Sequence, residues 1–297
     1  MINAVKTVLI TGSEGFTGQY MAAEMRSAGY HVVGLGTKSS TAVDYYQADL
    51  TSITELTAVI AQVQPEIVIH LAAIAFVGFG DANAFYQINL QGTRNLLEVL
   101  ATAEKKPEAI LLASSANVYG NTSEGSLSES TSPAPANDYA VSKLAMEYMA
   151  KLWQDRLPII ITRPFNYTGV GQAENFLLPK IVAHFKSQAS VIELGNLEVW
   201  RDFSDVRAVV NAYRGLIEAK AFGHIINVCS EDVYSLREIV AMCEEITGHN
   251  IQIQVNPAFV RADEVKILCG EATLLKTIIG DWNVPKLRET LTWMLRS

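Results

Sequence analysis

The stretch TVLITGSEGFTG, residues 7–18, decides the fold of this chain. The β-branched run over residues 5–11 predicts a short strand, and residues 19–27 predict a helix that ends by the next glycine. Three glycines, spaced three apart, stand between them. In a dinucleotide-binding unit the first permits a tight turn, the second lets the main chain approach a pyrophosphate, and the third allows close packing of helix on strand. We therefore expect this turn to bind a nucleotide at the N-terminus of the helix.

The alternation of strand and helix continues through the first half of the chain. Strands are predicted at residues 67–71, 109–113 and 157–162, with helices at 84–103 and 139–155 between them. Repeated units at this spacing favour a parallel sheet covered by helices on both faces, which is a Rossmann-type doubly wound α/β fold. Ligands of such sheets lie beyond the carboxyl ends of the strands, so we expect one site there.

The second half of the chain has shorter and less regular elements. We expect residues 1–166 to form a dinucleotide-binding Rossmann domain, with segments near 206–230 returning to it. Residues 167–297 are expected to form mainly a smaller C-terminal α/β lobe that binds the substrate and closes over the nucleotide site.

Composition excludes several classes of protein. The 23 Lys and Arg against 31 Asp and Glu give a net charge of −8 at pH 7, with no basic run, which argues against nucleic acid or an anionic membrane as a partner. Three cysteines at positions 229, 243 and 269 form no CxxC pair, so neither a disulfide framework nor a metal site is expected. No signal peptide or apolar run of membrane-spanning length is found, so we expect a soluble cytoplasmic protein.

Tyr139 and Lys143 are candidates for proton transfer. Four-residue spacing on a helix places both side chains on one face, where the ammonium group can favour the phenolate. Such a tyrosine can pass a proton to or from a substrate oxygen near neutral pH. The same spacing occurs on many surface helices, so the pair needs support from the rest of the chain.

The second strand, near residues 30–35, bears on the choice of cofactor. NAD sites place an acidic residue near its end for the ribose 2′-hydroxyl, whereas a 2′-phosphate needs a cation or hydroxyls. Here the strand is followed by GTKSS, residues 36–40, with no carboxylate before Asp44. We therefore favour NADP(H), bound through Lys38 and Ser39, over NAD(H). The alternative for Lys38 is a solvated loop charge.

Several motifs, in order along nearly the whole chain, resemble those of the extended short-chain dehydrogenase/reductase family. This family includes nucleotide-sugar epimerases, dehydratases and 4-keto reductases. The motifs are Gly12-x-x-Gly-x-x-Gly, Asp49-Leu50, His70-Leu-Ala-Ala, Asn89-x-x-Gly-Thr93, Ser114-Ser115-x-x-Val118-Tyr119-Gly120, Tyr139-x-x-x-Lys143 and Arg163-Pro-Phe-Asn166. Residues 163–172 and 195–207 are most similar to GDP-4-keto-6-deoxy-mannose reductases (GDP-D-rhamnose synthases) and to the related GDP-mannose 4,6-dehydratases.

The resemblance implies roles for particular residues. Tyr139 would be the general acid/base, Lys143 would hold the nicotinamide ribose and lower the pKa of the phenol, and Ser115 would hydrogen-bond the substrate carbonyl. The expected cofactor-binding residues are Gly12, Glu14, Gly15, Phe16, Thr17, Gly18, Lys38, Ser39, Asp49, Leu50, Leu71, Ala72, Ala73, Asn89, Tyr139, Lys143 and Pro164. The expected substrate-binding residues are Ser114, Ser115, Asn117, Asn166, Asn175, Arg201 and Arg261, and no metal ligand is expected.

Three of these assignments have alternatives. Ser115 could be an ordinary serine of a strand-end turn, and Asn89 could be structural or part of a proton path. Two guanidinium groups, from Arg201 and Arg261, suit a diphosphate. The surroundings of Arg261 match the family less closely, so a paired surface charge is its alternative.

One departure from the family pattern bears on the reaction. Dehydratases of this family carry an acidic residue two positions after the active-site Ser or Thr, and this chain has Asn117 there. Asparagine cannot take up a proton at neutral pH, so we expect an NAD(P)H-dependent reductase of a nucleotide-linked 4-keto-6-deoxy sugar, with GDP as the first choice. A 4-epimerase with tightly bound NAD is the alternative. A 4,6-dehydratase and a non-catalytic nucleotide sensor are less favoured.

The resemblance also implies a homodimer through a four-helix bundle. The helices would be residues 84–103 and 139–155 of each subunit. Their apolar residues could pack on both sides of each helix; these are Leu96, Leu97, Leu100, Leu144, Met146, Met149, Leu152 and Trp153. The alternative is helices buried only against their own sheet.

Overall fold

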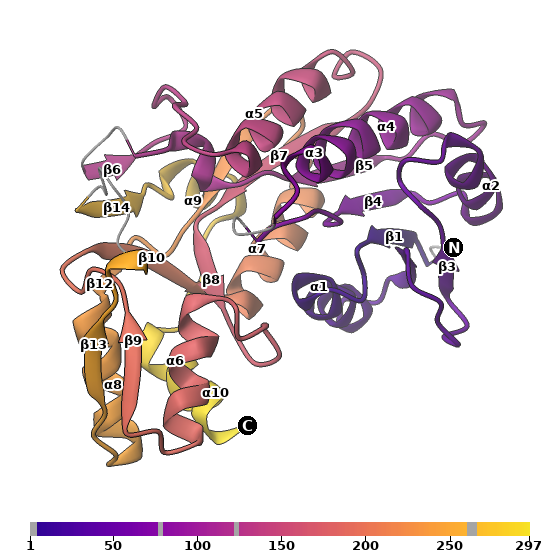
Figure 1. Cartoon of the computed structure of the whole chain (residues 1–297). Coiled ribbons are helices and arrows are strands. Elements are labelled where there is room, and N and C mark those ends of the chain that lie inside the picture. The colour runs from indigo at the N-terminus through magenta and orange to yellow at the C-terminus, as the bar shows by residue number, and fades with distance from the viewer. Residues whose placement is uncertain (1–4, 77–79, 122–124, 260–265) are drawn as a thin grey trace.

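A seven-stranded, entirely parallel sheet forms the centre of the molecule (Figure 1). The computed structural model describes residues 5–76, 80–121, 125–259 and 266–297. The strand order is β11-β7-β5-β4-β1-β2-β3, which is the predicted Rossmann-type arrangement. The strands are β1 (Thr7–Thr11), β2 (His31–Gly36), β3 (Tyr45–Gln47), β4 (Ile67–His70), β5 (Ala109–Ala113), β7 (Ile159–Pro164) and β11 (Ile225–Val228).

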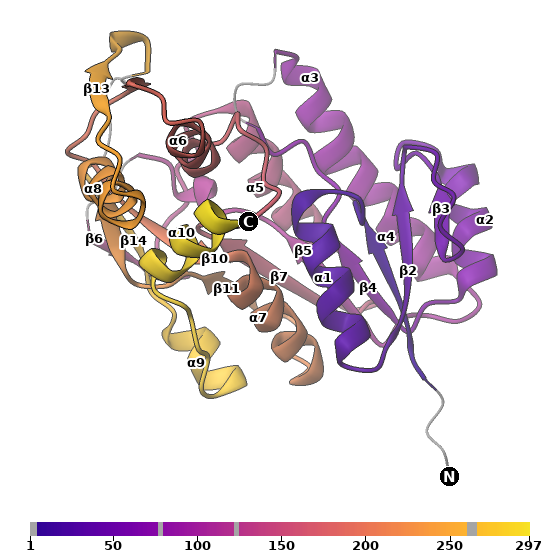
Figure 2. The ribbon, with the colours of Figure 1, turned by 90° about the horizontal axis from the view of Figure 1, so that it is seen from below.

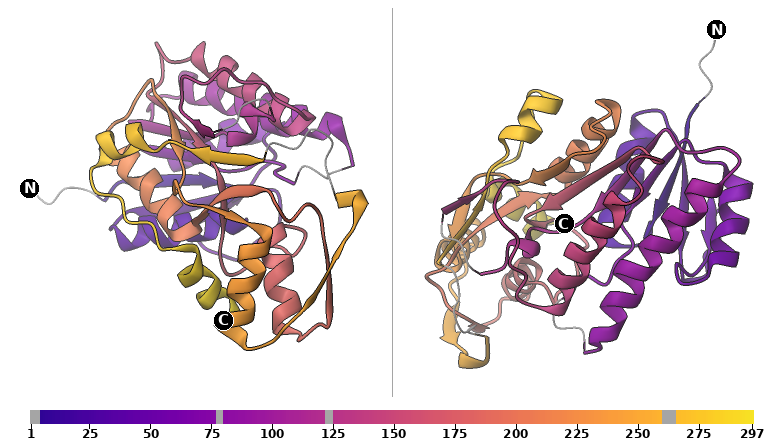
Figure 3. Two further views of the ribbon diagram at one scale, coloured as in Figure 1. Left: turned by 90° about the vertical axis from the view of Figure 1, so that its left-hand side faces the viewer. Right: turned by 90° about the horizontal axis from the view of Figure 1, so that it is seen from above.

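Helices cover both faces of this sheet, because its strands present apolar residues alternately to each side. Val8 and Ile10 of β1 belong to the apolar core under α1 (Phe16–Ser27) and α7 (Val206–Glu218). Leu9, between them, belongs to the core under the helices of the opposite face, which are α2 (Ile53–Val63), α4 (Thr93–Thr102) and α5 (Asp138–Lys151). Figure 3, seen from above, shows these last helices lying over the strands. Each fully buried aliphatic side chain contributes about 1.5–3 kcal/mol, so the sheet is held from both sides.

The helix predicted over residues 84–103 is interrupted by a π-helical segment. A short helix, α3 (Ala82–Phe85), leads into the π-helix η1 (Tyr86–Gly92), and α4 follows without a break. Segments of this kind occur often at functional sites, since the extra residue per turn redirects a side chain. Here the segment contains Asn89, which is buried.

Helix α4 is buried against its own sheet rather than kept free for a partner. Leu96, Leu97 and Leu100 are all fully buried in the core. The expectation that these leucines pack on both sides of the helix is therefore wrong. In α5, by contrast, Val141 and Tyr148 are exposed, as is Leu152 directly after the helix.

A second group of elements lies to the left of the main sheet in Figure 1, and part of it extends below the sheet. Its larger sheet has the order β12-β10-β14-β6, with β8 also paired to β10. Its strands are β6 (Gly125–Leu127), β8 (Asn166–Thr168), β10 (Trp200–Asp205), β12 (Val233–Ser235) and β14 (Ile267–Gly270). A two-stranded sheet joins β9 (Val191–Leu194) to β13 (Gln252–Val255), and the helices are α6 (Leu177–Lys186), α8 (Leu236–Thr247) and α10 (Leu287–Arg296). Helix α9 (Thr273–Ile279) instead packs on α7 and β11 of the main sheet. A separate apolar core packs α6, α8 and α10 together.

The chain after residue 166 contributes to both groups of elements. Strand β11 pairs with β7 at the edge of the main sheet, and α7 packs on α1. Figure 2 shows α7 beside the main sheet and α6, α8 and α10 gathered away from it. The boundary at residue 166 itself stays a prediction. Among the described residues, we find no helix with the length and apolar character needed to cross a membrane.

Candidate active site

The glycine turn lies where the order of the strands reverses, between β1 and β4. The Gly12 amide donates to the Leu35 carbonyl at 2.7 Å, which fixes the turn against the end of β2. A Cβ on Gly12 would come within 2.8 Å of the Ala72 main chain, and Gly12 has a φ of +70°. A Cβ on Gly18 would come within 2.1 Å of the Gly12 carbonyl oxygen. Both positions therefore need glycine for tight packing.

Gly15 differs from these two glycines. A Cβ there would meet only the Gly12 carbonyl oxygen, at 3.2 Å. The main chain of this turn is thus open on one side, at the start of α1, where unpaired amides favour an anion. These residues fit the diphosphate of a dinucleotide. Leu71, Ala72 and Ala73, which follow β4, are half-buried beside the turn.

Tyr139 and Lys143 lie one turn apart at the start of α5, as the spacing predicts. The Asn137 side chain caps this helix by accepting from the Ala140 amide at 2.9 Å. Tyr139 is 7% exposed and Lys143 is 5% exposed, so neither belongs to a solvated helix face. The Lys143 ammonium donates to the Ala113 carbonyl at 2.7 Å, at the end of β5. The pair therefore sits at the carboxyl ends of the strands.

The surroundings of the Tyr139 phenol act on its pKa in opposite directions. Burial raises the pKa of Tyr139 to about 12, although a hydrogen bond with Ser115 opposes the rise. Burial also lowers the pKa of Lys143 to about 8, against the attraction of Glu147. Burial and the neighbouring Tyr167 raise the pKa of the phenol and Ser115 opposes them, while the expected lowering by Lys143 stays a prediction.

The serines after β5 face different partners. The Ser115 hydroxyl accepts from the amide and the carboxamide of Asn117, at 3.1 and 3.0 Å, and it also bonds the Tyr139 phenol. Ser114 instead donates to the Glu147 carboxylate at 2.5 Å and is buried. Ser115 and Asn117 thus lie next to Tyr139. The hydroxyl of Ser114, which was expected to contact the substrate, instead hydrogen-bonds Glu147 in the protein interior.

A chain of buried polar groups connects the first strand to the π-helix. The His70 ring bonds the Thr11 hydroxyl at 2.7 Å through one nitrogen and the Thr93 hydroxyl at 2.8 Å through the other. Thr93 in turn donates to the Asn89 carbonyl at 2.7 Å. Burial, together with the charge of Lys143, lowers the pKa of His70 to about 3, so this ring is neutral. These hydrogen bonds fix the ends of β1 and β4 relative to the π-helix.

The side chain of Asn89 has structural partners. Its carboxamide bonds both the amide and the carbonyl of Ile74, at 2.9 and 3.1 Å, and donates to the Ser142 hydroxyl at 3.1 Å. Ser142 donates to the Tyr139 carbonyl at 2.8 Å. Asn89 therefore ties the loop after β4 to the helix that carries Tyr139, which agrees with the structural alternative.

A buried ion pair joins Arg163 at the end of β7 to Glu147 of α5, one turn after Lys143. Arg163 was noted only as part of a motif, and Glu147 was not expected at the site. The Arg163 guanidinium binds the Glu147 carboxylate through Nε and Nη2, at 2.9 and 2.6 Å. Its Nη1 donates to the Tyr119 hydroxyl at 3.0 Å, and that hydroxyl donates to Asn227 at 2.7 Å. Glu147 stands four residues after Lys143, so helical spacing was the available signal.

The expected adenosine end of the cofactor site lies around β2 and β3. Asp49 is exposed and accepts from the amide and hydroxyl of Thr51, both at 2.8 Å, while the neighbouring Leu50 is buried. Lys38 and Ser39 are exposed after β2. Their neighbour Tyr45, which the sequence did not single out, donates toward the Lys38 carbonyl at 2.7 Å.

Aromatic side chains join the start of α1 to β8 and the loop that follows it. The Tyr167 ring stacks on Phe16 with centroids 6.2 Å apart, and its hydroxyl bonds the Thr17 hydroxyl at 2.8 Å. Tyr20 donates to the Val170 carbonyl at 2.7 Å. Phe16 and Thr17 thus contact β8 itself, through Tyr167. No local pattern in the sequence pointed to Tyr167, because its contacts are long-range.

The residues expected to hold the substrate are spread over the second group of elements. Asn166 is exposed and donates to the main chain of β10 at 3.1 Å, and Asn175 is exposed in the turn before α6. Arg201 is half-buried on β10 and donates to the Trp200 carbonyl at 2.8 Å. Arg261 lies outside the described residues. Pro164, expected at the cofactor, is buried at the end of β7.

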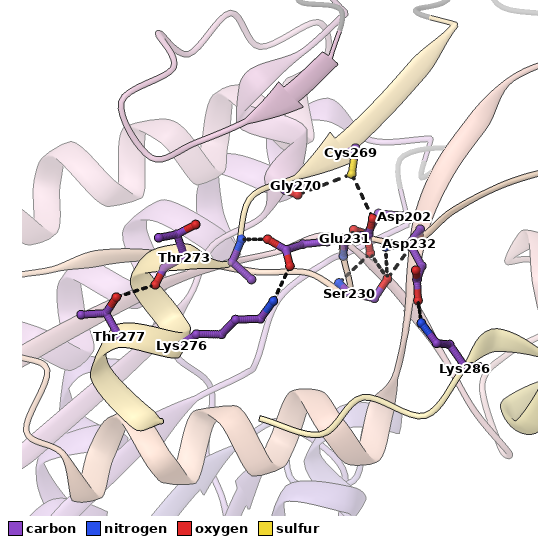
Figure 4. A network of polar contacts seen from close by, with 11 residues as sticks. Asp202, Ser230, Glu231, Asp232, Cys269, Gly270, Thr273, Lys276, Thr277 and Lys286 are labelled. Carbon is purple, nitrogen blue, oxygen red and sulfur yellow. Dashed lines mark hydrogen bonds and ion pairs between the residues drawn. The ribbon is translucent and has the colours of Figure 1, made fainter. Parts of the chain in front are cut away.

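Next to Arg201, a buried carboxylate anchors the loop after β11. Asp202 accepts from the amide and hydroxyl of Ser230 at 2.9 and 2.7 Å, and from the Glu231 amide at 2.8 Å (Figure 4). Burial raises the pKa of Asp202 to about 6, against these hydrogen bonds. Figure 4 also shows Glu231 paired with Lys276 and Asp232 paired with Lys286, which hold the loop from both sides.

Comparison with known proteins identifies relatives over nearly the whole chain. The family model described as "NAD dependent epimerase/dehydratase family" matches residues 8–229. GDP-6-deoxy-D-talose 4-dehydrogenase of Aggregatibacter actinomycetemcomitans is 33% identical, covering 98% of this chain and 97% of that protein. GDP-6-deoxy-D-mannose reductase of Pseudomonas aeruginosa is also 33% identical, covering 92% and 90%. UDP-glucose 4-epimerase of Mycoplasma genitalium is 30% identical, covering 72% and 70%.

Solved structures confirm the fold. A structure from Burkholderia cenocepacia J2315 is 49% identical, with a TM-score of 0.93 and coverage of 98% of this chain and 97% of that one. RMD from Pseudomonas aeruginosa, complexed with NADPH, is 29% identical, with a TM-score of 0.84 and coverage of 98% of each chain. MoeE5, in complex with UDP-glucose and NAD, is 26% identical, with a TM-score of 0.88 and coverage of 98% and 97%.

Proposed function

The chain belongs to the NAD dependent epimerase/dehydratase family, and on that premise we propose that it reduces the 4-keto group of a nucleotide-linked 4-keto-6-deoxy sugar. The observation that carries this proposal is the grouping of Tyr139, Ser115 and Asn117. It offers one phenol as proton donor and an amide where the family's dehydratases need an acid. Reduction of a ketone needs only one proton, so this set suffices.

The chain's own residues support the reductive direction. Bound NAD(P)H supplies the hydride to C4. Tyr139 gives its proton to the C4 oxygen, so that the carbonyl becomes a hydroxyl and the dinucleotide is oxidised. A phenol whose pKa burial raises to about 12 carries its proton at neutral pH, and the alkoxide that forms at C4 is a strong enough base to take it. Ser115 donates to the same oxygen and stabilises the charge that develops on it.

GDP is the proposed nucleotide, because two relatives at 33% identity are named for GDP-6-deoxy sugars. Those names differ in the sugar, talose or mannose, which are epimers at C4 of the 6-deoxy sugar. Both fit a hydride delivered to C4 and differ in the face that receives it. Asn166, Asn175 and Arg201 are the proposed substrate contacts in the second group of elements.

The experiment is a screen of 4-keto-6-deoxy sugars linked to GDP, CDP, dTDP and UDP, with NADH and NADPH. We expect the GDP-linked sugar to oxidise the reduced dinucleotide. Tyr139→Phe should lower kcat by about 10²–10⁴-fold with normal cofactor binding. The matched control is Tyr30→Phe, because the hydroxyl of Tyr30, just before β2, bonds only the exposed Glu218 carboxylate among the described residues, at 3.3 Å. The proposal fails if no keto sugar oxidises either dinucleotide, or if Tyr139→Phe retains full turnover.

A 4-epimerase is the second candidate, favoured by the UDP-glucose 4-epimerase among the relatives. Such an enzyme uses the same residues but returns the hydride to the other face of the sugar. It would be purified with a tightly bound dinucleotide and would consume none in turnover. Mass spectrometry of the denatured protein, together with turnover without added dinucleotide, separates the two candidates.

The proposal includes a homodimer through α5. Val141, Tyr148 and Leu152 are exposed and recur at helical spacing on one side. Light scattering should give twice the chain mass for the native protein, and Leu152→Asp should shift it toward the monomer. Val43→Asp, at a residue 96% exposed elsewhere, is the control. A native monomer at micromolar concentration would contradict the dimer.

A further inference from the structure

Glu14 belongs to the glycine turn, but its carboxylate reaches the end of β2. The hydroxyl of Tyr45, on β3, lies 3.0 Å from Glu14 Oε2. The same hydroxyl donates toward the Lys38 carbonyl at 2.7 Å. A Cβ on Gly36, the last residue of β2, would lie 2.6 Å from the Tyr45 hydroxyl and 3.5 Å from Glu14 Oε2. The missing side chain of Gly36 thus leaves the space that these two groups occupy.

The end of the second strand is the ribose-binding position of a dinucleotide fold. The pyrophosphate lies over the glycine turn, and the adenosine ribose extends past the end of the second strand, where an acidic residue binds its 2′-hydroxyl. The Gly12 amide bonds the Leu35 carbonyl at 2.7 Å, so turn and strand end are in direct contact. A carboxylate that comes from the turn therefore reaches the position where one from the strand would stand.

The first carboxylate after β2, Asp44, points elsewhere. Its carbonyl accepts from the Gly34 amide at 2.9 Å, and its side chain pairs with His31 at 3.4 Å, at the opposite end of β2. Lys38, the cation expected at a 2′-phosphate, has its main chain fixed by Tyr45 while the residue as a whole is exposed. The group held at the strand end is thus negative.

The hydrogen bonds at this point leave Glu14 able to accept more. A phenol has one proton, and the Tyr45 hydroxyl has two acceptors, the Glu14 carboxylate and the Lys38 carbonyl. Burial and the bond to Glu14 raise the pKa of Tyr45 to about 12, so the phenol keeps that proton. A ribose hydroxyl would give the carboxylate a full donor, whereas a 2′-phosphate would bring two negative charges against it.

We propose that Glu14, held by Tyr45, selects the adenosine ribose of the cofactor, and that the protein binds NAD(H) in preference to NADP(H). This inference rests on the proposed dinucleotide site but concerns only its adenosine half. It opposes the NADP(H) preference predicted from Lys38 and Ser39. That prediction counted residues after the second strand, whereas the selecting carboxylate comes from the first turn.

The test is a titration of the full-length protein with NADH and with NADPH, followed by nicotinamide fluorescence. Any copurified dinucleotide is first released and identified by mass spectrometry. We expect NADH to bind about tenfold or more tighter than NADPH. Glu14→Gln, which removes the charge and keeps the size, should bring the two affinities about tenfold closer. Tyr45→Phe should shift them in the same direction by less.

The controls separate the competing explanations. Asp44→Asn removes the neighbouring carboxylate that points away and should leave the affinity ratio unchanged. Lys38→Ala should also leave it unchanged, whereas a selective loss of NADPH binding there would support the opposite preference. The inference is overturned if NADPH binds tighter, if copurified dinucleotide is NADP, if neither dinucleotide binds, or if Glu14→Gln leaves the ratio unaltered. Because no sugar takes part, a protein with this selectivity and no reductase activity would refute only the proposed reaction.

Discussion

Glu147 and Asp202 are two fully buried carboxylates that are neutralised in different ways. Glu147, behind the site in the main sheet, meets the guanidinium of Arg163 in a two-point ion pair. Asp202, in the second group of elements, is held by a hydroxyl and amides, so that its partners within the described chain are neutral donors. Burial raises the pKa of Asp202 to about 6, into the range of physiological acidity.

The difference shows what each arrangement can do. A buried ion pair is costly to break, because removing one partner leaves the other charge without solvent or counterion. A carboxylate held by dipoles can gain a proton without leaving a charge behind, so its contribution varies with pH. The rigid pair lies under Tyr139 and Lys143, and the titratable group lies beside Arg201, where the substrate is expected.

The largest expected effect comes from breaking the ion pair. Glu147→Gln leaves the Arg163 cation buried without its counterion and should lower the free energy of unfolding by about 3–5 kcal/mol. Urea unfolding followed by circular dichroism measures it. The control is Glu98→Gln, which breaks the half-exposed pair of Glu98 with Arg94 and should cost no more than about 0.5 kcal/mol. If both variants lose an equally small amount of unfolding free energy, burial does not make the first ion pair more important than the second.

The second effect concerns Asp202 and pH. Its folded-state pKa lies above the unfolded value of 3.8, so protonation favours the folded state. The stabilisation is fully present below the unfolded pKa and is lost as pH rises through about 6, a change of about 3 kcal/mol. Asp202→Asn should remove this loss between pH 4 and pH 7, as measured by urea unfolding at each pH.

The control for that pH dependence is Asp281→Asn, at an exposed aspartate of the same half of the chain. It should keep the native dependence on pH. Equal pH dependence in native protein and Asp202→Asn would mean that the buried carboxylate does not titrate in this range.

The smallest effect is expected from Tyr119→Phe. The hydroxyl accepts from Arg163 at 3.0 Å and donates to Asn227 at 2.7 Å, so its loss should cost about 1–2 kcal/mol of unfolding free energy. Arg163 keeps its ion pair with Glu147, so the loss of stability is limited to the hydrogen bonds of the hydroxyl. Tyr30→Phe, which removes one exposed hydrogen bond of 3.3 Å to Glu218, is the control and should cost less than about 0.5 kcal/mol. A loss as large as that of Glu147→Gln would mean that the hydroxyl, rather than the carboxylate, holds the guanidinium.

Local patterns predicted the parts of the molecule that depend on near neighbours. Gly12 and Gly18 follow from the steric demands of one turn, and the face shared by Tyr139 and Lys143 follows from helical spacing. Strand β5 begins and ends at the predicted residues, because it is a short apolar run between turns. The parallel direction of the main strands follows from the alternation of strand and helix.

What the sequence could not indicate depends on distant partners. Strands β6 and β14 are short, and they pair with each other although β6 lies near the middle of the chain and β14 near its end, so neither carries a strong local signal. The pKa of the Tyr139 phenol is raised mainly by burial, and burial is set by the whole fold. Tyr45 reaches Glu14 although α1 and β2 lie between them in the chain, and no spacing rule connects the two residues.

The position of β11 at the edge of the main sheet has a consequence for synthesis. A ribosome completes β7 well before it makes residues 225–228, and the intervening chain must fold elsewhere in the meantime. During that interval β7, with its run Ile159-Ile160-Ile161, presents an unpaired apolar edge to other nascent chains. Edges of this kind recruit further strands, so aggregation during translation competes with completion of the sheet. The yield of this protein in cells should therefore depend on how quickly the later half is synthesised, in addition to the stability of the finished fold.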